Sequence, residues 1–260
     1  MRKIVISVIA MLGLATACAQ QASRSDAVSE NNTGNDTVTD TFMTKSGKTV
    51  AIYPLVHASM RIVFGDKEIV VDPVTSLNGR NFDFATMPKA DIILVTHEHH
   101  DHFDAKAISA LSDNDTRLIA NKKCVDSYGA GEVMANGDSL RLADDISVKA
   151  VPAYNTTKGH QQFHPKGNGN GYILNLDGLK IYIAGDTENI PEMSELGDIG
   201  IDVAFLPCNQ PYTMTPDQLI RVAKIIKPKV LYPYHFGDTD LSKIPSALTD
   251  SGIDVRIRKF

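Results

Sequence analysis

The sequence predicts an α/β fold that begins at about residue 42. From that point, short apolar stretches of strand length alternate with segments of helical periodicity, and Gly, Pro, Asn and Asp separate them. The chain has 260 residues, of which 43% are hydrophobic and 22% are charged. This composition is ordinary for a globular protein, and the length suits one large domain or two small ones.

The predicted strands are short runs rich in Val, Ile, Leu and Tyr that are bounded by turn-forming residues. In chain order they are Val50–Tyr53, Met60–Phe64, Glu68–Asp72, Asp91–Val95, Ile146–Val151, Tyr172–Leu176, Leu179–Ala184, Val203–Pro207 and Val230–Tyr234.

Two helices are predicted, the first over about Asp104–Leu111. The second has clear end signals, because Thr215 and Gln218 form a Thr-x-x-Gln capping box, Pro216 occupies the first turn and Pro228 ends the helix. Its apolar residues recur with helical spacing, so one face should pack on a sheet; these residues are Leu219, Val222, Ala223 and Ile226.

Residues 1–18 have the composition of a secretion signal. Arg2 and Lys3 precede an apolar run that ends at Ala17 and is too short to span a bilayer comfortably. Ala15-Thr16-Ala17-Cys18 fits a bacterial lipobox, in which Cys18 would carry the lipid, and Ala15-Thr16-Ala17 also fits ordinary signal cleavage. The protein is therefore expected to be exported, either periplasmic or membrane-anchored as a lipoprotein.

Residues 19–41 contain almost no large apolar side chains and are predicted to be a flexible tether ahead of a domain over 42–260. The formal net charge of −5 disfavours a nucleic-acid partner, whose binding depends on positive charge. The expected partner is a small-molecule substrate, with membrane contact only through a lipid on Cys18. Cys124 and Cys208 are expected to be free and buried, although an oxidising compartment would allow them to pair.

The most informative motif directly follows the predicted strand Asp91–Val95. It reads His-x-His-x-Asp-His, with His97, His99, Asp101 and His102, and half of the chain's eight histidines lie within it. Imidazole and carboxylate groups bind zinc and similar divalent ions at neutral pH. Crowding them together costs free energy unless a cation compensates. The motif therefore predicts a metal site at the end of this strand.

This motif resembles the signature of the metallo-β-lactamase superfamily, and the resemblance extends over about residues 50–240. It implies a four-layer αβ/βα sandwich, in which two sheets face each other, helices cover their outer sides and metal ions lie at one edge between the sheets. It also implies that His97 and His99 hold one ion together with a third histidine, and that Asp101 and His102 hold a second ion.

The same resemblance assigns the remaining ligands. Asp186, directly after a strand and Gly185, resembles the carboxylate that bridges the two ions, and His235 at the end of another strand resembles the last histidine. The third histidine is either His164 or His160. His164 is preferred because its His-Pro-Lys-Gly turn resembles a lactonase-like branch of metal-dependent hydrolases, similar to ascorbate-6-phosphate lactonase.

Other residues resemble supporting groups of the superfamily. Asp72 resembles a structural aspartate that hydrogen-bonds the metal loop or a ligand imidazole. His57 lies in a His-x-Ser element and is expected either to contact the substrate or to be a surface histidine. Lys166 would hold an anionic substrate group if it lies at the rim, and otherwise is an ordinary solvated lysine. Glu98 and His100, between the ligands, are expected to face away from the ions.

The resemblance implies a hydrolase with two divalent metal ions, with zinc the expected metal. A metal-bound hydroxide would attack an ester, lactone or phosphoester, and Asp101 or Asp186 would pass a proton to the leaving group. One alternative is an iron redox enzyme of the same fold, although the diiron branch carries glutamate at the position of His99. Another is a non-catalytic surface lipoprotein that binds a metal or ligand.

Overall fold

The computed structural model describes residues 39–77 and 79–260. The predicted secretion signal with Cys18, and nearly all of the predicted tether, lie outside these residues. Strand β1 (Asp40–Met43) begins two residues before the predicted start of the domain. Its first residue belongs to the folded part because Arg256 and Arg258 donate hydrogen bonds to the Asp40 carboxylate. Within the described residues, no helix combines the length and apolar character needed to cross a membrane.

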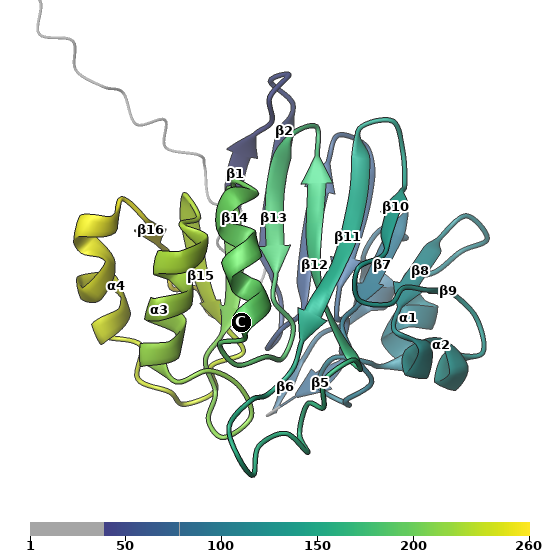
Figure 1. Cartoon of the computed structure of the whole chain (residues 1–260). Coiled ribbons are helices and arrows are strands. Elements are labelled where there is room, and N and C mark those ends of the chain that lie inside the picture. The colour runs from purple at the N-terminus through teal and green to yellow at the C-terminus, as the bar shows by residue number, and fades with distance from the viewer. Residues whose placement is uncertain (1–38, 78) are drawn as a thin grey trace, which may run out of the picture. The chain divides into compact units, whose positions relative to one another are not determined.

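Two seven-stranded sheets face each other (Figure 1). The first has the order β1-β2-β3-β4-β7-β8-β9, and the second runs from β10 to β16 in chain order. The other strands of the first sheet are β2 (Thr49–Pro54), β3 (Met60–Phe64), β4 (Lys67–Val71), β7 (Ile92–Val95), β8 (Arg117–Ala120) and β9 (Glu132–Val133). Those of the second are β10 (Ser139–Arg141), β11 (Ile146–Ala153), β12 (Gly169–Leu176), β13 (Leu179–Ile183), β14 (Val203–Pro207), β15 (Val230–Tyr234) and β16 (Asp254–Val255). A small hairpin is formed by β5 (Ser76–Leu77) and β6 (Arg80–Asn81).

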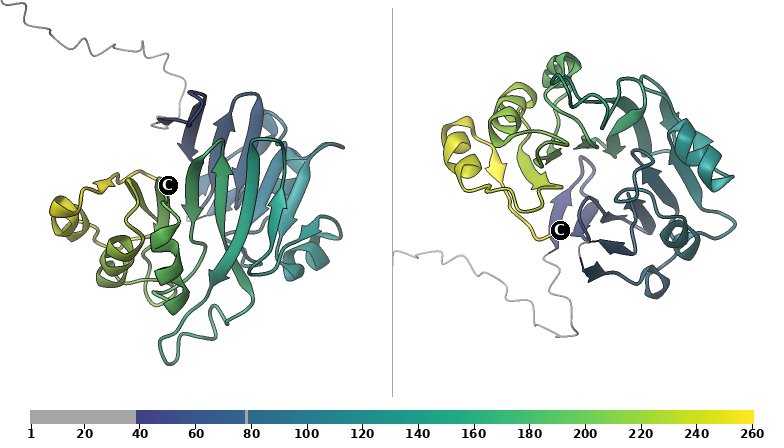
Figure 2. Two further views of the ribbon diagram at one scale, coloured as in Figure 1. Left: turned by 45° about the horizontal axis from the view of Figure 1, so that its top comes forward. Right: turned by 90° about the horizontal axis from the view of Figure 1, so that it is seen from below.

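Helices cover the outer side of each sheet, which confirms the four-layer sandwich (Figure 2). The first sheet packs on α1 (Ala105–Leu111) and α2 (Lys122–Tyr128), and the second on η2 (Pro191–Asp198), α3 (Pro216–Ile226) and α4 (Lys243–Leu248). The described chain also contains two single turns of 3-10 helix, η1 (Phe84–Thr86) and η3 (Thr249–Ser251). The capping box at Thr215 and Gln218 is present as predicted.

The residue pattern of each strand matches its place in the layers. In β3, buried residues alternate with half-buried ones, since this strand has one core face. Strands β7, β14 and β15 are buried at every position because they lie between the other sheet and the helices.

The parallel strands end at one common edge of the sandwich, the lower edge in Figure 1. The two sheets are joined there by hydrogen bonds from Tyr172 Oη to the Val95 carbonyl (2.8 Å) and from Asn170 N to the Thr96 carbonyl (3.0 Å). Loops that follow β4, β7, β13 and β15 therefore meet at this edge, as the ligand side chains at strand ends require.

All nine predicted strands are present; β3, β14 and β15 have the predicted bounds, and the ends of the other six differ by at most three residues. The elements that were not predicted are strands β1, β5, β6, β8, β9, β10 and β16, helices α2 and α4, and the 3-10 helices η1, η2 and η3. Each is short, and α2 is held by an Asn121 cap and by burial of Cys124 more than by an apolar periodicity. Cys124 and Cys208 are free and buried, as expected.

Candidate metal centre

Seven predicted ligand side chains converge at the edge where the sheets meet. His97 and His99 follow β7, and the loop then turns through a hydrogen bond from His102 N to the His99 carbonyl (2.9 Å). Asp186 follows β13, and His235 follows β15. His164 lies in the long loop between β11 and β12.

The first group of potential ligands is His97, His99 and His164, whose donor atoms all lie within 4.8 Å of one another. Nε2 of His164 is 3.2 Å from Nδ1 of His99. Nitrogen ligands at about 2.0–2.1 Å from a tetrahedral ion stand about 3.3–3.4 Å apart, so this spacing suits a shared ion. No group of potential ligands among the described residues includes His160, whose Nδ1 lies 3.2 Å from Oε1 of Glu188. Of the two sequence candidates, the structure places His164 in the cluster.

The second group consists of His57, Asp101, His102 and His235. Oδ2 of Asp101 lies 3.2 Å from Nε2 of His57 and 3.5 Å from Nε2 of His235. The rings of His57 and His235 are 3.8 Å apart between centroids. His57 was expected to contact the substrate or to be a surface histidine. Its side chain is only 9% exposed, and it belongs to this group of potential ligands while also lining the adjoining pocket.

Asp186 lies between the two groups. Its Oδ2 is 3.1 Å from Nε2 of His164 and 3.2 Å from Nε2 of His235, and its Oδ1 is 3.2 Å from Nε2 of His102. It also forms a third group with His97 and His102. One carboxylate therefore reaches both groups, which is the placement expected for a bridging ligand.

Several atoms of this cluster are buried without a hydrogen-bond partner in the described part of the chain. They are Nε2 of His97, Nε2 of His102, both ring nitrogens of His235 and Oδ1 of Asp186. Buried polar atoms are rarely left unpaired, because each costs free energy. Imidazole nitrogens and carboxylate oxygens are also the donor set that zinc takes in proteins. The residues present therefore fit metal ions.

Neighbouring groups fix the orientation of two imidazoles. Asp72 accepts hydrogen bonds from Thr96 N (2.7 Å) and Thr96 Oγ1 (2.8 Å), and its Oδ2 lies 2.8 Å from Nδ1 of His102. Nδ1 of His164 lies 3.0 Å from the Tyr212 carbonyl. In both rings the contact at Nδ1 leaves Nε2 directed at the cluster. The supporting role predicted for Asp72 matches these contacts.

Unusual backbone conformations are also concentrated at the centre. Of the five non-glycine residues with positive φ in the described chain, three belong to it: His57 (59°), Asp72 (43°) and His235 (47°). This left-handed region is disfavoured for residues with a Cβ, and such residues often mark functional sites.

Burial and neighbouring charges shift the pKa values of these groups. Burial lowers the pKa of His57 to about 4, and burial beside His102 lowers that of His97 well below its usual value. Neutral imidazole is the form that binds a metal. Burial opposes the charge on His235, but the carboxylates of Asp186 and Asp101 outweigh it and raise its pKa to about 9. A cation beside these carboxylates would take the place of that proton.

The cluster opens into a pocket of about 390 Å³. Beyond the ligands, the pocket is lined by Leu77, His100, Phe163, Asn209 and Tyr212. Of these, only His100 had been singled out from the sequence, and it lies exposed at the rim. Asn209 comes two residues after the end of β14, so a search for polar residues at strand ends could have found it.

Glu98 and Lys166 are engaged away from the cluster. Glu98 accepts hydrogen bonds from Asn121, Lys123 and Asn168, so it braces the metal loop against its neighbours. Nζ of Lys166 lies 2.8 Å from Glu192, and it does not line the pocket. These contacts support the hypothesis that Lys166 is an ordinary solvated lysine and not a residue that binds an anionic group of the substrate.

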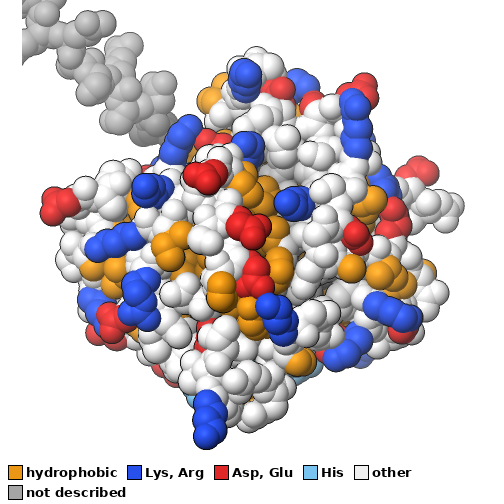
Figure 3. All heavy atoms as spheres, in the orientation of Figure 1, with side chains coloured by type: hydrophobic (Ala, Val, Ile, Leu, Met, Phe, Trp, Pro, Cys, Tyr) orange, Lys and Arg blue, Asp and Glu red, His pale blue; other side chains and the backbone are white. Residues whose placement is uncertain are grey.

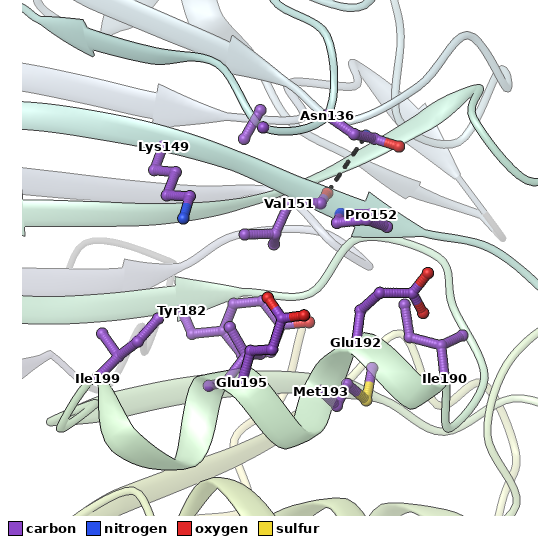
Figure 4. A pocket seen from close by; sticks show the side chains of 13 residues that line it. Asn136, Lys149, Val151, Pro152, Tyr182, Ile190, Glu192, Met193, Glu195 and Ile199 are labelled. Atoms are coloured by element: carbon purple, nitrogen blue, oxygen red, sulfur yellow. Dashed lines mark hydrogen bonds between the residues drawn. The ribbon is translucent and has the colours of Figure 1, made fainter.

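A second hollow of about 410 Å³ lies on the outer side of the second sheet, between β11 and η2. Figure 4 shows its wall formed by Val151 and Pro152 on one side and by Ile190 and Met193 on the other. The face drawn in Figure 3 has apolar side chains in its middle with acidic ones among them, while histidines show only at its lower edge. No group of potential metal ligands within the described residues lies in this hollow.

Comparison with known proteins decides the family. Residues 51–235 match the Beta-lactamase superfamily domain, and this range includes every potential ligand described above. The chain belongs to the metallo-β-lactamase superfamily.

Relatives of this superfamily member are named as metal-dependent hydrolases. It is 30% identical over 208 residues to the UPF0173 metal-dependent hydrolase of Pelotomaculum thermopropionicum, covering 76% of this chain and 89% of the relative. The corresponding protein of Thermococcus onnurineus is 32% identical over 196 residues, covering 70% and 82%. The chain thus falls among the metal-dependent hydrolases of the superfamily.

Solved structures agree with this placement. A crystal structure from Parabacteroides distasonis, named as a candidate metal-dependent hydrolase, has a TM-score of 0.81 and 51% identity, covering 85% of this chain and 98% of that one. Igni18, a metallo hydrolase from Ignicoccus hospitalis, has a TM-score of 0.69 at 23% identity over 81% and 95% of the two chains. The second likeness shows the shared fold.

Proposed function

We propose that this metal-dependent hydrolase binds two divalent ions, zinc foremost, and cleaves an ester, lactone or phosphoester. The observation that carries the proposal is the position of Asp186 between two groups of potential ligands. His97, His99 and His164 would hold one ion, and Asp101, His102 and His235, with His57 beside them, would hold the other. The cluster offers imidazole nitrogens and carboxylate oxygens, which are among the donors that zinc takes in proteins.

Two ions held in this way would lower the pKa of a bound water and neutralise charge that develops on a carbonyl or phosphoryl oxygen. The side chains supply the geometry for this chemistry. Asp72 and the Tyr212 carbonyl keep Nε2 of His102 and of His164 directed at the cluster, so little reorganisation is needed during a reaction.

Asp101 is the better placed of the two carboxylates to move a proton. Its side chain is 21% exposed and lines the pocket, whereas that of Asp186 is 3% exposed and enclosed by imidazoles. In this proposal Oδ2 of Asp101 accepts the proton of the attacking water and passes it to the leaving group. His57, 3.2 Å away, holds that carboxylate in position.

The location of the protein is a separate part of the proposal. The N-terminal pattern Ala15-Thr16-Ala17-Cys18 supports export, with a lipid on Cys18 that anchors the domain to a membrane through the tether. Mass spectrometry of the mature N-terminus from native membranes tests this. A lipidated Cys18 supports anchoring, and a peptide that begins at unmodified Cys18 supports simple cleavage.

The activity is tested by metal removal and reconstitution. The protein is stripped with a chelator, reloaded with zinc, manganese or iron, and assayed on ester, lactone and phosphoester substrates. We expect hydrolysis that disappears without metal and returns with zinc. Asp101→Asn should lower kcat by about 10²–10⁴-fold, the usual contribution of a general base or acid.

Asp217→Asn is the matched control, because this carboxylate is exposed on α3 and, within the described residues, forms an ion pair only with Lys243. It should leave the rate unchanged. A zinc-loaded protein that hydrolyses none of the three substrate classes, or one that works only with iron in a redox assay, would contradict the proposed activity.

A further inference from the structure

Beyond the potential ligands, three of the five side chains that line the pocket are apolar or aromatic, and the other two are His100 and Asn209. Phe163 and Tyr212 lie there edge to face, with ring centroids 5.0 Å apart, and Leu77 of β5 also lines the pocket. Tyr212 is 44% exposed, one of the few large apolar side chains that remain open to solvent among the described residues. A large aromatic residue left exposed at the mouth of a pocket suggests a contact surface for a ligand.

These aromatic rings are held in place relative to the metal cluster. Phe163 directly precedes His164 in the chain. The Tyr212 carbonyl accepts hydrogen bonds from Nδ1 of His164 (3.0 Å) and from Nδ2 of Asn155 (2.7 Å). The two aromatic rings and the first group of ligands are therefore one connected unit. A part of the substrate that lies on the rings would have a fixed position relative to the bond that reacts.

Among the described residues that line the pocket, none is Lys or Arg. Lys166 follows closely after His164, but its Nζ is bound to Glu192 and Tyr154. Arg80 and Lys259 line a neighbouring hollow that adjoins the pocket at His57 and Leu77. An anionic arm would find no partner along the aromatic wall.

We propose that the substrate carries an uncharged apolar arm, an acyl chain or an aromatic ring, which lies against Phe163 and Tyr212. Its ester or lactone bond would then lie at the histidine cluster. This inference rests on the proposed hydrolase activity and narrows its substrate class. The uncharged amide of Asn209 makes no side-chain hydrogen bond within the described chain, so it is free to orient a polar group of the substrate.

The first test uses 4-nitrophenyl esters that share one leaving group: acetate, octanoate and the half ester of octanedioic acid, all below micelle-forming concentrations. Each methylene that is fully buried favours binding by about fourfold. We therefore expect kcat/KM to be at least about tenfold higher for the octanoate than for the acetate, and the carboxylate-ended ester to lose this advantage.

Tyr212→Ala should bring the ratio of octanoate to acetate kcat/KM toward one, whereas Tyr212→Phe should keep it. The hydrogen bond to His164 uses the backbone carbonyl of Tyr212, so the substitution leaves that contact in place. Met43→Ala is the control, since it removes an exposed apolar side chain from β1, outside the pocket lining. A parent protein with no chain-length preference would overturn the inference.

A second readout measures binding without turnover. Calorimetry on the zinc-loaded protein compares octanohydroxamic with acetohydroxamic acid, which share a chelating head and differ in the arm. Tighter binding of the longer acid that is lost in Tyr212→Ala supports the proposed site for the apolar arm. If no ester is cleaved in that case, only the proposed hydrolase activity is rejected. Cleavage of esters with equal binding of both acids would reject the apolar arm and keep the hydrolase activity.

In the ester assay, a preference for the carboxylate-ended ester that falls in Arg80→Ala would replace the apolar arm by an anionic one.

Discussion

Nδ1 of His102 lies 2.8 Å from Oδ2 of Asp72, and both side chains are fully buried. The same carboxylate binds the backbone and side chain of Thr96, the residue before the first ligand. A single aspartate at the end of β4 therefore holds both the start of the metal loop and the ring of a potential ligand. It also directs Nε2 of His102 toward Asp186, 3.2 Å away.

Asp72→Asn should weaken metal binding about 10–100-fold, as loss of an outer partner of a ligating histidine generally does. Asparagine tolerates the positive φ of 43° at this position, so the backbone is kept while one acceptor is replaced by an amide donor. Titration of the metal-loaded protein against a chromophoric chelator measures the change. An affinity equal to that of the parent would show that the contact with His102 does not support the site.

Gly185→Ala should displace Asp186, the residue that lies between the two groups of potential ligands. Gly185 has φ of +64°, and a Cβ there would lie 2.7 Å from the Asn170 carbonyl and 3.2 Å from Thr96, so the chain before Asp186 would have to move. We expect a loss of about 2 kcal/mol or more in the free energy of unfolding, together with weaker metal binding.

The matched control is Gly47→Ala, because Gly47 also has a positive φ (86°) but nothing within 4 Å of the added Cβ. It should cost about 1 kcal/mol, from backbone strain alone, and leave metal binding intact. Urea unfolding and metal titration are measured on both variants. Equal effects of the two substitutions would argue against crowding at Gly185.

The ends of the described chain are joined by an ion pair whose stability should depend on pH. Burial raises the pKa of Asp40, but the hydrogen bonds and charge of Arg258 outweigh it, so the net pKa lies below its usual value of 3.8. A carboxylate with a lowered pKa in the folded state stabilises the protein above the unfolded pKa, and this stabilisation is lost as the pH falls through the folded value.

Arg258→Met should therefore cost about 1–3 kcal/mol at pH 7 and progressively less as the pH falls from 5 to 3. Urea unfolding of parent and variant across this range measures the difference. Lys243→Met breaks the exposed pair with Asp217 and should cost much less than Arg258→Met at pH 7, with little change over these pH values. A cost for Arg258→Met that does not change with pH would mean that the ionised form of Asp40 is not what the arginine stabilises.

Strongly patterned parts of the chain could be predicted from the sequence. Buried strands such as Val203–Pro207 are apolar throughout, and the Thr215 capping box marks its helix by local chemistry. Residues at strand ends, such as Asp186 and His235, could be proposed as ligands from their resemblance to the superfamily, and their positions agree with the rule that parallel strands bring their ends to one edge.

Other features depend on tertiary contacts that leave no local pattern. Helix α2 has seven residues and an exposed surface, so its burial of Cys124 could not be read from periodicity. His164 and His160 lie four residues apart in one loop, and only the fold decides that one faces the cluster while the other pairs with Glu188. The aromatic wall was missed for the same reason, because Phe163 and Tyr212 meet across a long sequence separation.

The central claim, two metal ions held by two groups that share Asp186, is tested most directly by metal content. Elemental analysis of the parent, His164→Ala and His160→Ala proteins gives the number of ions per chain. We predict about two zinc ions in the parent, about one in His164→Ala and no loss in His160→Ala. A parent without tightly bound metal, or a loss that follows His160→Ala and not His164→Ala, would contradict this account.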